Sequence, residues 1–214
     1  LYAAGGFRPY SDEELCEVLY AELKDVPEWC RVDRVARDIP ANEIAAGSKK
    51  SNVPQILDQW FVRDGISQRD IRAREIYDGE VSAEDVQLVV RRYQASGGEE
   101  VFLSYEDVGR DKLIALLRLR FPGSKVCLEE LTGAALVREV HVYGKQVKIS
   151  SEGDLRRQQG EVQHGGFGSK LLAKAEELAL EAGFKRVAVI AGIGTREYYR
   201  KFGYELDRSY VVKG

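Results

Sequence analysis

Residue types that commonly bind metals or form disulfides are scarce in this sequence. Its three cysteines, Cys16, Cys30 and Cys127, are odd in number and widely spaced, so they form neither a disulfide framework nor a C-x-x-C metal pair. Its two histidines, His141 and His164, argue against a zinc site built on these residue types. We therefore expect no bound metal, and we expect unpaired thiols in a reducing cytoplasm.

Long apolar runs and a secretory leader are absent as well. The longest apolar stretch, residues 187–193, is far too short to cross a bilayer, and no basic segment followed by an apolar one opens the chain. The net charge of -3 argues against a uniformly basic nucleic-acid binder but is compatible with a local basic patch. We expect a cytoplasmic protein without a membrane span. Because the chain starts at Leu1 and contains no methionine, we also expect a fragment of a longer protein.

The first part of the chain predicts a small region with helices and strands. The 214 residues, 44% of them apolar, are enough for one domain and part of a second. Ser11 and Glu14 form the pattern of a capping box before a helical apolar period. The elements expected there are helices at residues 11–23 and 53–62, strands at 31–39 and 66–76, and a loop at 41–52.

The second part of the chain predicts mostly strands. The elements expected there are a helix at 82–95, a turn at 97–98, strands at 100–105, 112–121 and 134–143, a loop at 150–162, a helix at 166–182, a strand at 186–191, a short helix at 196–202 and a strand at 205–212. This order predicts an α/β (α+β) fold with helices flanking a sheet, preceded by a smaller, partial α/β region. We place the boundary near residue 78, which gives domains 1–78 and 79–214.

A glycine-containing turn precedes the long helix of the second domain. Gly166-Phe167-Gly168 would present unpaired backbone N–H groups and the positive end of the helix to an anion. Glycine lets that backbone come close to a phosphate because it has no Cβ. On its own, such a turn is more often a plain tight turn. Gln163, the apolar strand after the helix and a tyrosine-rich short helix complete an order that resembles GNAT acetyltransferases, in which the Q-x-x-G-x-G turn binds the pyrophosphate of coenzyme A.

A wider resemblance covers nearly the whole chain. Several segments resemble the family of the catalytic (third) subunit of Elongator. They are residues 37–40, 69–75, 102–107, 116–120, 136–144, 163–168 and 194–204. The resemblance implies a GNAT fold with a mixed, mostly antiparallel sheet. It also implies an enzyme that places an acetyl-derived carboxymethyl group on the wobble uridine of tRNA.

That family joins a radical S-adenosylmethionine domain, with a cysteine-ligated iron–sulfur cluster, to an acetyltransferase domain. The cluster-binding cysteine triplet is missing here, so S-adenosylmethionine and a [4Fe-4S] cluster are expected in the full-length protein and not in this fragment. Residues 1–78 would be the end of the radical domain and a linker, and residues 79–214 the acetyltransferase domain. Ser51 and Gln68 stand where the family often has a linker histidine and cysteine, so we predict no linker metal.

The resemblance also implies a set of acetyl-CoA-binding residues. They are Glu139, Val140, His141 and Val142, mainly through the backbone, then Gln163, His164, Gly165, Gly166, Phe167, Gly168, Ser169 and Lys170, and finally Tyr199. His141 could equally be a packed residue of the strand or have a chemical role. We therefore do not assign it as a base.

Two adjacent tyrosines are the candidate catalytic residues. Tyr198 and Tyr199 share one short helix, where neighbours point ~100° apart, so one of them can face the thioester squarely. The resemblance favours Tyr199, whose phenol would protonate the leaving thiolate. An aromatic packing pair is the alternative interpretation, and it applies more strongly to Tyr198.

Several arginines could bind phosphate groups of RNA. The candidates are Arg69, Arg72, Arg74, Arg91 and Arg92, together with Arg31, Arg34 and Arg37. Acidic residues are interleaved with arginines along the first domain, so the residues alone indicate solvated faces, and the resemblance favours tRNA. The expected partners are tRNA, acetyl-CoA and either other Elongator subunits or a second copy of the chain. A protein lysine N-acetyltransferase and a non-catalytic scaffold that binds tRNA and acetyl-CoA are the alternatives.

Overall fold

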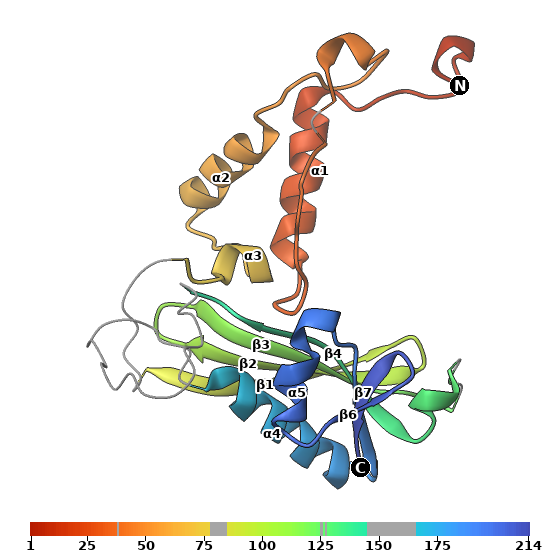
Figure 1. Ribbon diagram of the computed structural model, residues 1–214. Coiled ribbons are helices and arrows are strands. Elements are labelled where there is room, and N and C mark those ends of the chain that lie inside the picture. Colours follow the sequence, from red (N-terminus) through yellow and green to blue (C-terminus); the bar gives the residue numbers. More distant parts are fainter. Residues whose placement is uncertain (38, 78–84, 125, 127, 145–165) are drawn as a thin grey trace. The chain divides into compact units, whose positions relative to one another are not determined.

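The computed structural model describes the chain except residues 38, 78–84, 125, 127 and 145–165 (Figure 1). It divides into two compact units, Leu1–Arg74 and Glu75–Gly214. Within the described residues, no helix is both long enough and apolar enough to cross a membrane.

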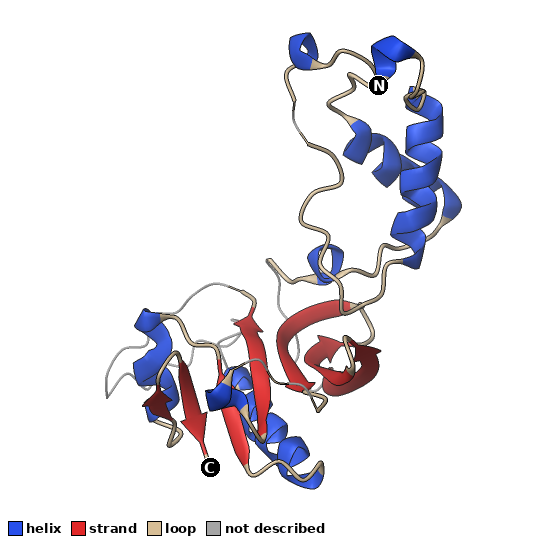
Figure 2. Cartoon of the chain, turned by 90° about the vertical axis from the view of Figure 1, so that its right-hand side faces the viewer, coloured by secondary structure: helices blue, strands red, loops and turns tan. Residues whose placement is uncertain are grey.

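The described elements of the first unit are helices, which Figure 2 shows in blue. They are α1 (Asp12–Asp25), α2 (Val53–Asp64), the single turn α3 (Ile71–Arg74) and the 3-10 turns η1 (Tyr2–Ala4) and η2 (Ala41–Glu43). The predicted capping box at α1 is confirmed. The Ser11 Oγ accepts from the Glu14 amide at 3.2 Å, and the Glu14 carboxylate accepts from the Ser11 amide at 2.8 Å. The bounds of α1 and α2 confirm both helices predicted for this unit.

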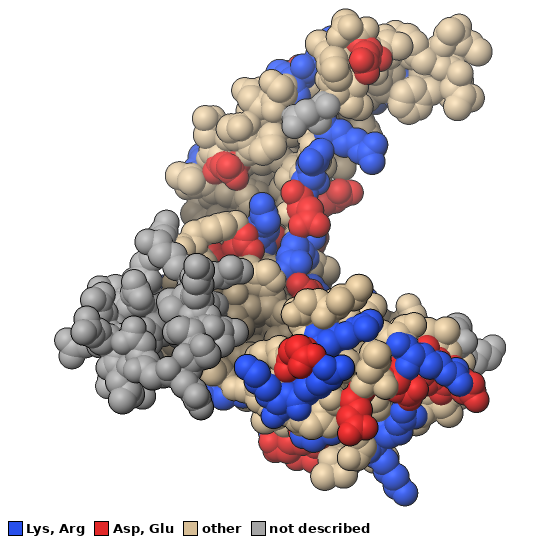
Figure 3. Space-filling view, in the orientation of Figure 1, with Lys and Arg blue, Asp and Glu red and all other residues tan. Residues whose placement is uncertain are grey.

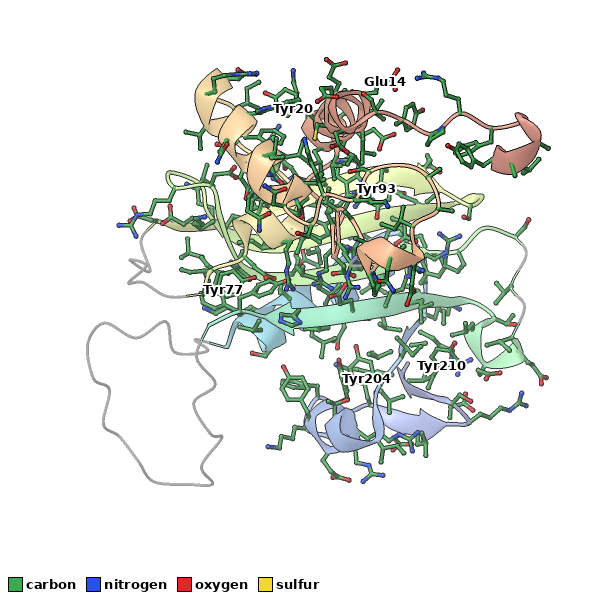
Figure 4. The ribbon with its side chains drawn as sticks, turned by 90° about the horizontal axis from the view of Figure 1, so that it is seen from above. Glu14, Tyr20, Tyr77, Tyr93, Tyr204 and Tyr210 are labelled. Carbon is green, nitrogen blue, oxygen red and sulfur yellow. The ribbon has the colours of Figure 1, made fainter. Side chains whose placement is uncertain are left out.

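A small apolar core joins α1 to α2. Cys16 and Leu23 of α1 are buried in one cluster with Leu57 and Phe61 of α2. Tyr20, labelled in Figure 4, extends this contact, because its hydroxyl donates to the Asp64 carboxylate at 2.6 Å.

The two strands predicted for the first unit are wrong. Residues 31–37 have no regular secondary structure, and residues 71–74 form a helical turn instead of an extended segment. The buried Asp70 carboxylate accepts from the amides of Val32 at 3.2 Å and Arg72 at 2.9 Å. An aspartate that satisfies amides at a helix start favours the turn over an extended conformation. An alternating pattern also needs a partner strand, and no strand is present among the described residues of this unit.

The described residues of the second unit form a mixed sheet of seven strands in the order β1-β2-β3-β4-β5-β7-β6 (Figure 1). The strands are β1 (Val86–Ala95), β2 (Gly98–Asp107), β3 (Lys112–Phe121), β4 (Ala134–Val142), β5 (Arg186–Val189), β6 (Glu205–Asp207) and β7 (Tyr210–Lys213). The helical elements are α4 (Phe167–Glu181), α5 (Arg196–Arg200), η3 (Glu129–Leu131) and η4 (Ile193–Thr195). β4 and β5 run parallel and the other pairs are antiparallel. The predicted fold class, a mostly antiparallel sheet flanked by helices, is confirmed.

Two predictions for this unit need correction. The helix expected at residues 82–95 is wrong over its described part, because residues 86–95 form β1 and pair with β2 along their whole length. A tight turn with positive φ at Ser96 (48°) and Gly97 (70°) joins these two strands, as is typical of a hairpin. The strand predicted at residues 205–212 is in fact two strands, β6 and β7. The chain reverses after Asp207, where Arg208 has a φ of 54°.

Helix α4 covers one face of the sheet. Its apolar side chains Leu171, Leu172, Ala175, Leu178 and Ala179 are all buried against the sheet, whereas Ala182, just after the helix, is exposed. Each buried leucine of this kind contributes about 1.5–3 kcal/mol relative to an exposed one. This packing fixes the position of the first turn of α4 relative to β3 and β4.

Candidate functional site

The sheet opens between its two parallel strands. β4 pairs with β5 from Ala134 opposite Arg186 to Val137 opposite Val189, and the Ile190 amide makes one further bond to the Val137 carbonyl at 3.2 Å. β4 then continues to Val142, and residues 138–142 have no described strand beside them on the β5 side. Their outer backbone groups are therefore positioned to hydrogen-bond a ligand.

A β-bulge lies where the opening begins. The register between β3 and β4 shifts so that Arg118 faces Glu139 while Leu119 faces Val137, which leaves Arg138 as the extra residue. A bulge bends its strand and changes which face the following side chains occupy. Val137 and Val140 consequently both pack in the cluster beneath α4.

The first turn of α4 starts at a left-handed glycine. Gly166 has φ 73° and ψ 19°, and its carbonyl accepts from the Lys170 amide at 2.9 Å and from the Ser169 Oγ at 2.7 Å. The amides of the first turn have no partner within the helix, which makes them suited to bind an anion. The Lys170 ammonium lies 5.3 Å from the centre of the Phe167 ring. Gln163, His164 and Gly165, which were also predicted to bind the cofactor, lie outside the described residues.

Three elements of the opening meet at Gly168. A Cβ added there would lie 2.9 Å from the Tyr198 hydroxyl of α5 and 3.6 Å from Cγ2 of Val142 in β4. The first of these distances is shorter than real Cβ contacts allow. A side chain at this position would therefore require Tyr198 to shift, and the turn, the end of β4 and α5 lie side by side.

The two candidate catalytic tyrosines occupy different places. Tyr198 is half-buried and packs on Phe202, with ring centres 5.0 Å apart, while its hydroxyl reaches the first turn of α4. Tyr199 is only 8% exposed and packs edge-on against Tyr204 in the core. Burial raises the pKa of both phenols, and for Tyr199 the neighbouring Tyr198 raises the pKa further. Both phenols therefore keep their protons at neutral pH.

Behind Tyr199 lies a polar cluster that the sequence analysis did not find. The buried Tyr204 donates its hydroxyl to the Glu176 carboxylate at 2.8 Å, and the Lys213 ammonium bonds the other carboxylate oxygen at 2.7 Å. Burial, and then the bond to Glu176, raise the pKa of Tyr204. The three residues come from α4, β7 and the turn after α5, so no local sequence pattern could reveal the cluster.

The side chains of Glu139 and His141 do not point into the opening. Glu139 pairs with Arg118 at 2.9 Å, and the His141 ring packs against the Tyr143 ring with centres 4.3 Å apart and planes tilted by 36°. Both side chains lie on the sheet face opposite α4, because Val140 and Val142 pack on the α4 side. This arrangement leaves the backbone of residues 139–142, and not these two side chains, at the opening.

The predicted RNA-binding arginines are divided between the two units. Arg69 pairs with Glu28, Arg91 with Glu106 at 2.7 Å and Arg92 with Glu99 at 2.8 Å. Arg72 and Arg74 belong to α3, where Arg72 is exposed and Arg74 is buried. On the face shown in Figure 3, basic and acidic side chains alternate without a uniformly basic surface.

Comparisons with known proteins cover the chain from end to end. Residues 1–62 match the family model of the Radical_SAM C-terminal domain. The chain is 42% identical over its whole length to Elongator complex protein 3 of Bos taurus, and 40% identical to the tRNA uridine(34) acetyltransferase of Methanocaldococcus jannaschii. The entire chain is homologous to Elongator complex protein 3.

A solved structure agrees with this homology. The structure of archaeal Methanocaldococcus infernus Elp3 with its N-terminus deleted matches 99% of this chain at 40% identity, with a TM-score of 0.83. This chain spans 39–40% of the length of the two curated relatives and 50% of the solved chain. The homology therefore concerns the part of Elongator complex protein 3 that this chain aligns with.

Metal-binding groups do not gather in the described parts of the chain. Within the residues that the structure describes, no group of three or more His, Cys, Asp or Glu side chains is arranged to hold a metal ion. The two described cysteines, Cys16 and Cys30, are free thiols.

Proposed function

We propose that this chain is the acetyl-CoA-binding acyltransferase part of an enzyme that modifies the wobble uridine of tRNA. The single observation that carries the proposal is the opening of β4 away from β5 after Val137, directly beside the glycine turn of α4. Homology to Elongator complex protein 3 and to tRNA uridine(34) acetyltransferase supports tRNA as the acceptor.

In the proposed complex, acetyl-CoA lies along the opened edge of β4. Its pyrophosphate accepts hydrogen bonds from the first-turn amides between Gly166 and Lys170, which the positive end of α4 favours. Its pantetheine arm and acetyl carbonyl accept hydrogen bonds from the backbone of residues 139–142. The thioester then lies close to α5, where Tyr198 and Tyr199 are found.

The proposed chemistry is acyl transfer from sulfur. The acceptor attacks the thioester carbonyl carbon, the carbon–sulfur bond breaks, and the leaving thiolate takes a proton from a phenol. In hydrolysis the acceptor is water. One of its protons restores the phenol and the other is released to solvent, so the products are acetate and free coenzyme A. Donors placed where negative charge develops lower the barrier of such a reaction.

We propose Tyr199 as the proton donor, as the resemblance implies, and Tyr198 as a contact of the glycine turn. The protonated state of both phenols at neutral pH supports an acid role. In the full-length enzyme, a radical domain with S-adenosylmethionine and a [4Fe-4S] cluster would activate the acetyl group for carboxymethyl-uridine formation. Other Elongator subunits or a second copy of the chain are the proposed protein partners.

The test is acetyl-CoA hydrolysis by the purified chain, measured with and without tRNA. We expect tRNA to stimulate release of free coenzyme A. Binding of both ligands without turnover would identify a scaffold instead. Acetylation of lysine peptides with no response to tRNA would identify a protein lysine N-acetyltransferase.

A further inference from the structure

The bulge that starts the opening is held from the sheet face opposite α4. Arg138, the extra residue, reaches a partner on β2, and Glu139, the next residue, reaches one on β3, both on that face. Two consecutive side chains on one face are possible only because the bulge interrupts the alternation of β4.

The first of these contacts centres on a buried carboxylate. Glu100 of β2 is 2% exposed, and its Oε1 accepts from the guanidinium groups of Arg120 and Arg138, each at 2.8 Å. Arg120 lies directly opposite Glu100 on β3 and also donates to the Ala95 and Ser96 carbonyls at 3.0 and 3.1 Å. Arg138 is therefore tied to a buried, doubly bonded carboxylate on the hairpin of β1 and β2.

The second contact is a row of three side chains across three strands. Arg118 of β3 lies directly opposite Glu139 of β4 on one side and Phe102 of β2 on the other. It bonds the Glu139 carboxylate at 2.9 Å, and its guanidinium lies 5.5 Å from the centre of the Phe102 ring. The row is tightly placed, since Phe102 is buried and the Arg118 side chain is only 17% exposed.

These contacts select one of two registers for β4. Without the bulge, Val140 and Val142 would turn to the face opposite α4, because a shift of one residue exchanges the faces of a strand. The two ion pairs form only in the bulged register, in which Arg138 and Glu139 share a face. They therefore stabilise the backbone path that carries residues 139–142 away from β5.

We infer that Glu100 is a positioning residue for acetyl transfer, acting through Arg138 on the backbone of β4 rather than by touching the cofactor. This inference rests on the proposed function, because it assumes that the opened edge of β4 binds the thioester. The pyrophosphate would be bound by α4, so Glu100 should affect turnover more than affinity.

The test compares Glu100→Gln with Glu99→Gln, its neighbour on β2. Glu99 also pairs with an arginine, Arg92, at 2.8 Å, but at a more exposed position and remote from the bulge. We expect Glu100→Gln to lower kcat for tRNA-stimulated acetyl-CoA hydrolysis on the order of 10²-fold, since misplacement from a remote substitution can cost that much. The acetyl-CoA Kd should change far less than kcat, and Glu99→Gln should change neither.

Turnover is measured at a temperature well below the thermal unfolding midpoint of each variant. A variant that is only less stable is then still folded and turns over normally. Arg138→Gln provides a second variant at a half-exposed position, and it should lower kcat as Glu100→Gln does. Arg138→Lys keeps the charge and should retain most of the activity.

Three results would overturn the inference while leaving the proposed function intact. The first is normal turnover by Glu100→Gln, and the second is a loss of kcat in Glu99→Gln equal to that in Glu100→Gln. The third is an equal loss of kcat in Arg138→Gln and Arg138→Lys. If the unaltered chain neither binds nor hydrolyses acetyl-CoA, the proposed function fails first, and this inference fails with it.

Discussion

At the scale of single residues, Gly168 is the point at which the turn, the opened strand and α5 touch. Its missing Cβ leaves room for the Tyr198 hydroxyl, so Gly168→Leu should displace that ring and obstruct the approach of a phosphate. We expect acetyl-CoA to bind at least about tenfold more weakly, which corresponds to roughly 1.4 kcal/mol. Gly194→Ala is the matched control, because a Cβ there meets no atom within 4 Å. Unchanged affinity of Gly168→Leu in calorimetry would refute the assignment of the turn.

The two tyrosines differ by one hydroxyl each from phenylalanines that would pack in the same way. Tyr199→Phe should lower turnover by ~10²–10⁴-fold, the usual contribution of a general acid, and leave acetyl-CoA affinity nearly unchanged. Tyr198→Phe should have a much smaller effect on turnover. Thioester cleavage in the presence of tRNA is measured beside binding for each variant. The opposite pattern would make Tyr198 the proton donor, and normal turnover by both variants would leave only a packing role.

The raised pKa of Tyr199 gives this assignment a pH signature. A general acid works while it is protonated, so kcat should decline only as pH rises through the pKa of its phenol. Burial and Tyr198 move that pKa above its ordinary value of ~10, which places the decline at higher pH than for a free phenol. If kcat already declines with rising pH before pH ~9 is reached, another group is the proton donor.

At the scale of elements, the bonds among Tyr204, Glu176 and Lys213 connect α4 to the C-terminal hairpin. Tyr204→Phe leaves a half-buried carboxylate with one partner fewer, so we expect a loss of about 1–3 kcal/mol in the free energy of unfolding. Tyr210→Phe is the matched control. Tyr210, labelled in Figure 4, is half-buried, and no hydrogen bond of its hydroxyl is found among the described residues. Urea denaturation near pH 7 compares the two, and equal midpoints would contradict the prediction.

The same cluster predicts an alkaline weakness of the fold. The pKa of Tyr204 is raised on folding, so its contribution to stability is complete below the pKa of the unfolded phenol, ~10, and is lost progressively above it. The stability difference between the unaltered chain and Tyr204→Phe should therefore shrink above pH ~10. Unfolding curves at a series of alkaline pH values measure it.

At the scale of the whole molecule, tRNA binding should be dominated by phosphate contacts. If so, the logarithm of the association constant for tRNA falls by roughly 0.7–0.9 per phosphate contact for each log unit of salt concentration. Arg72→Glu should then weaken binding across tRNA sequences. Arg63→Glu changes the net charge equally, at an exposed position of the same unit that is outside the predicted set, and should have little effect. Filter binding at several salt concentrations tests both variants. Affinity that does not depend on salt would favour a protein substrate.

Local patterns in the sequence determined several elements by themselves. Ser11 and Glu14 predict the start of α1 because a capping box satisfies amides within one turn. The apolar stripe of α4 and the glycine before it predict a helix that starts after that glycine and buries one face. Each of these signals acts between residues that are three or four positions apart, so the sequence alone is sufficient.

Tertiary structure alone decided the elements that depend on distant partners. Residues 86–95 became a strand because β2 pairs with them along their length, and residues 31–37 and 71–74 have no such partner among the described residues of their unit. The bond between Arg138 of the bulge and Glu100 spans 38 residues, and the bonds to Glu176 from Tyr204 and Lys213 span 28 and 37 residues. Such contacts form only when the sheet and α4 bring remote segments together, so no local period or spacing could reveal them.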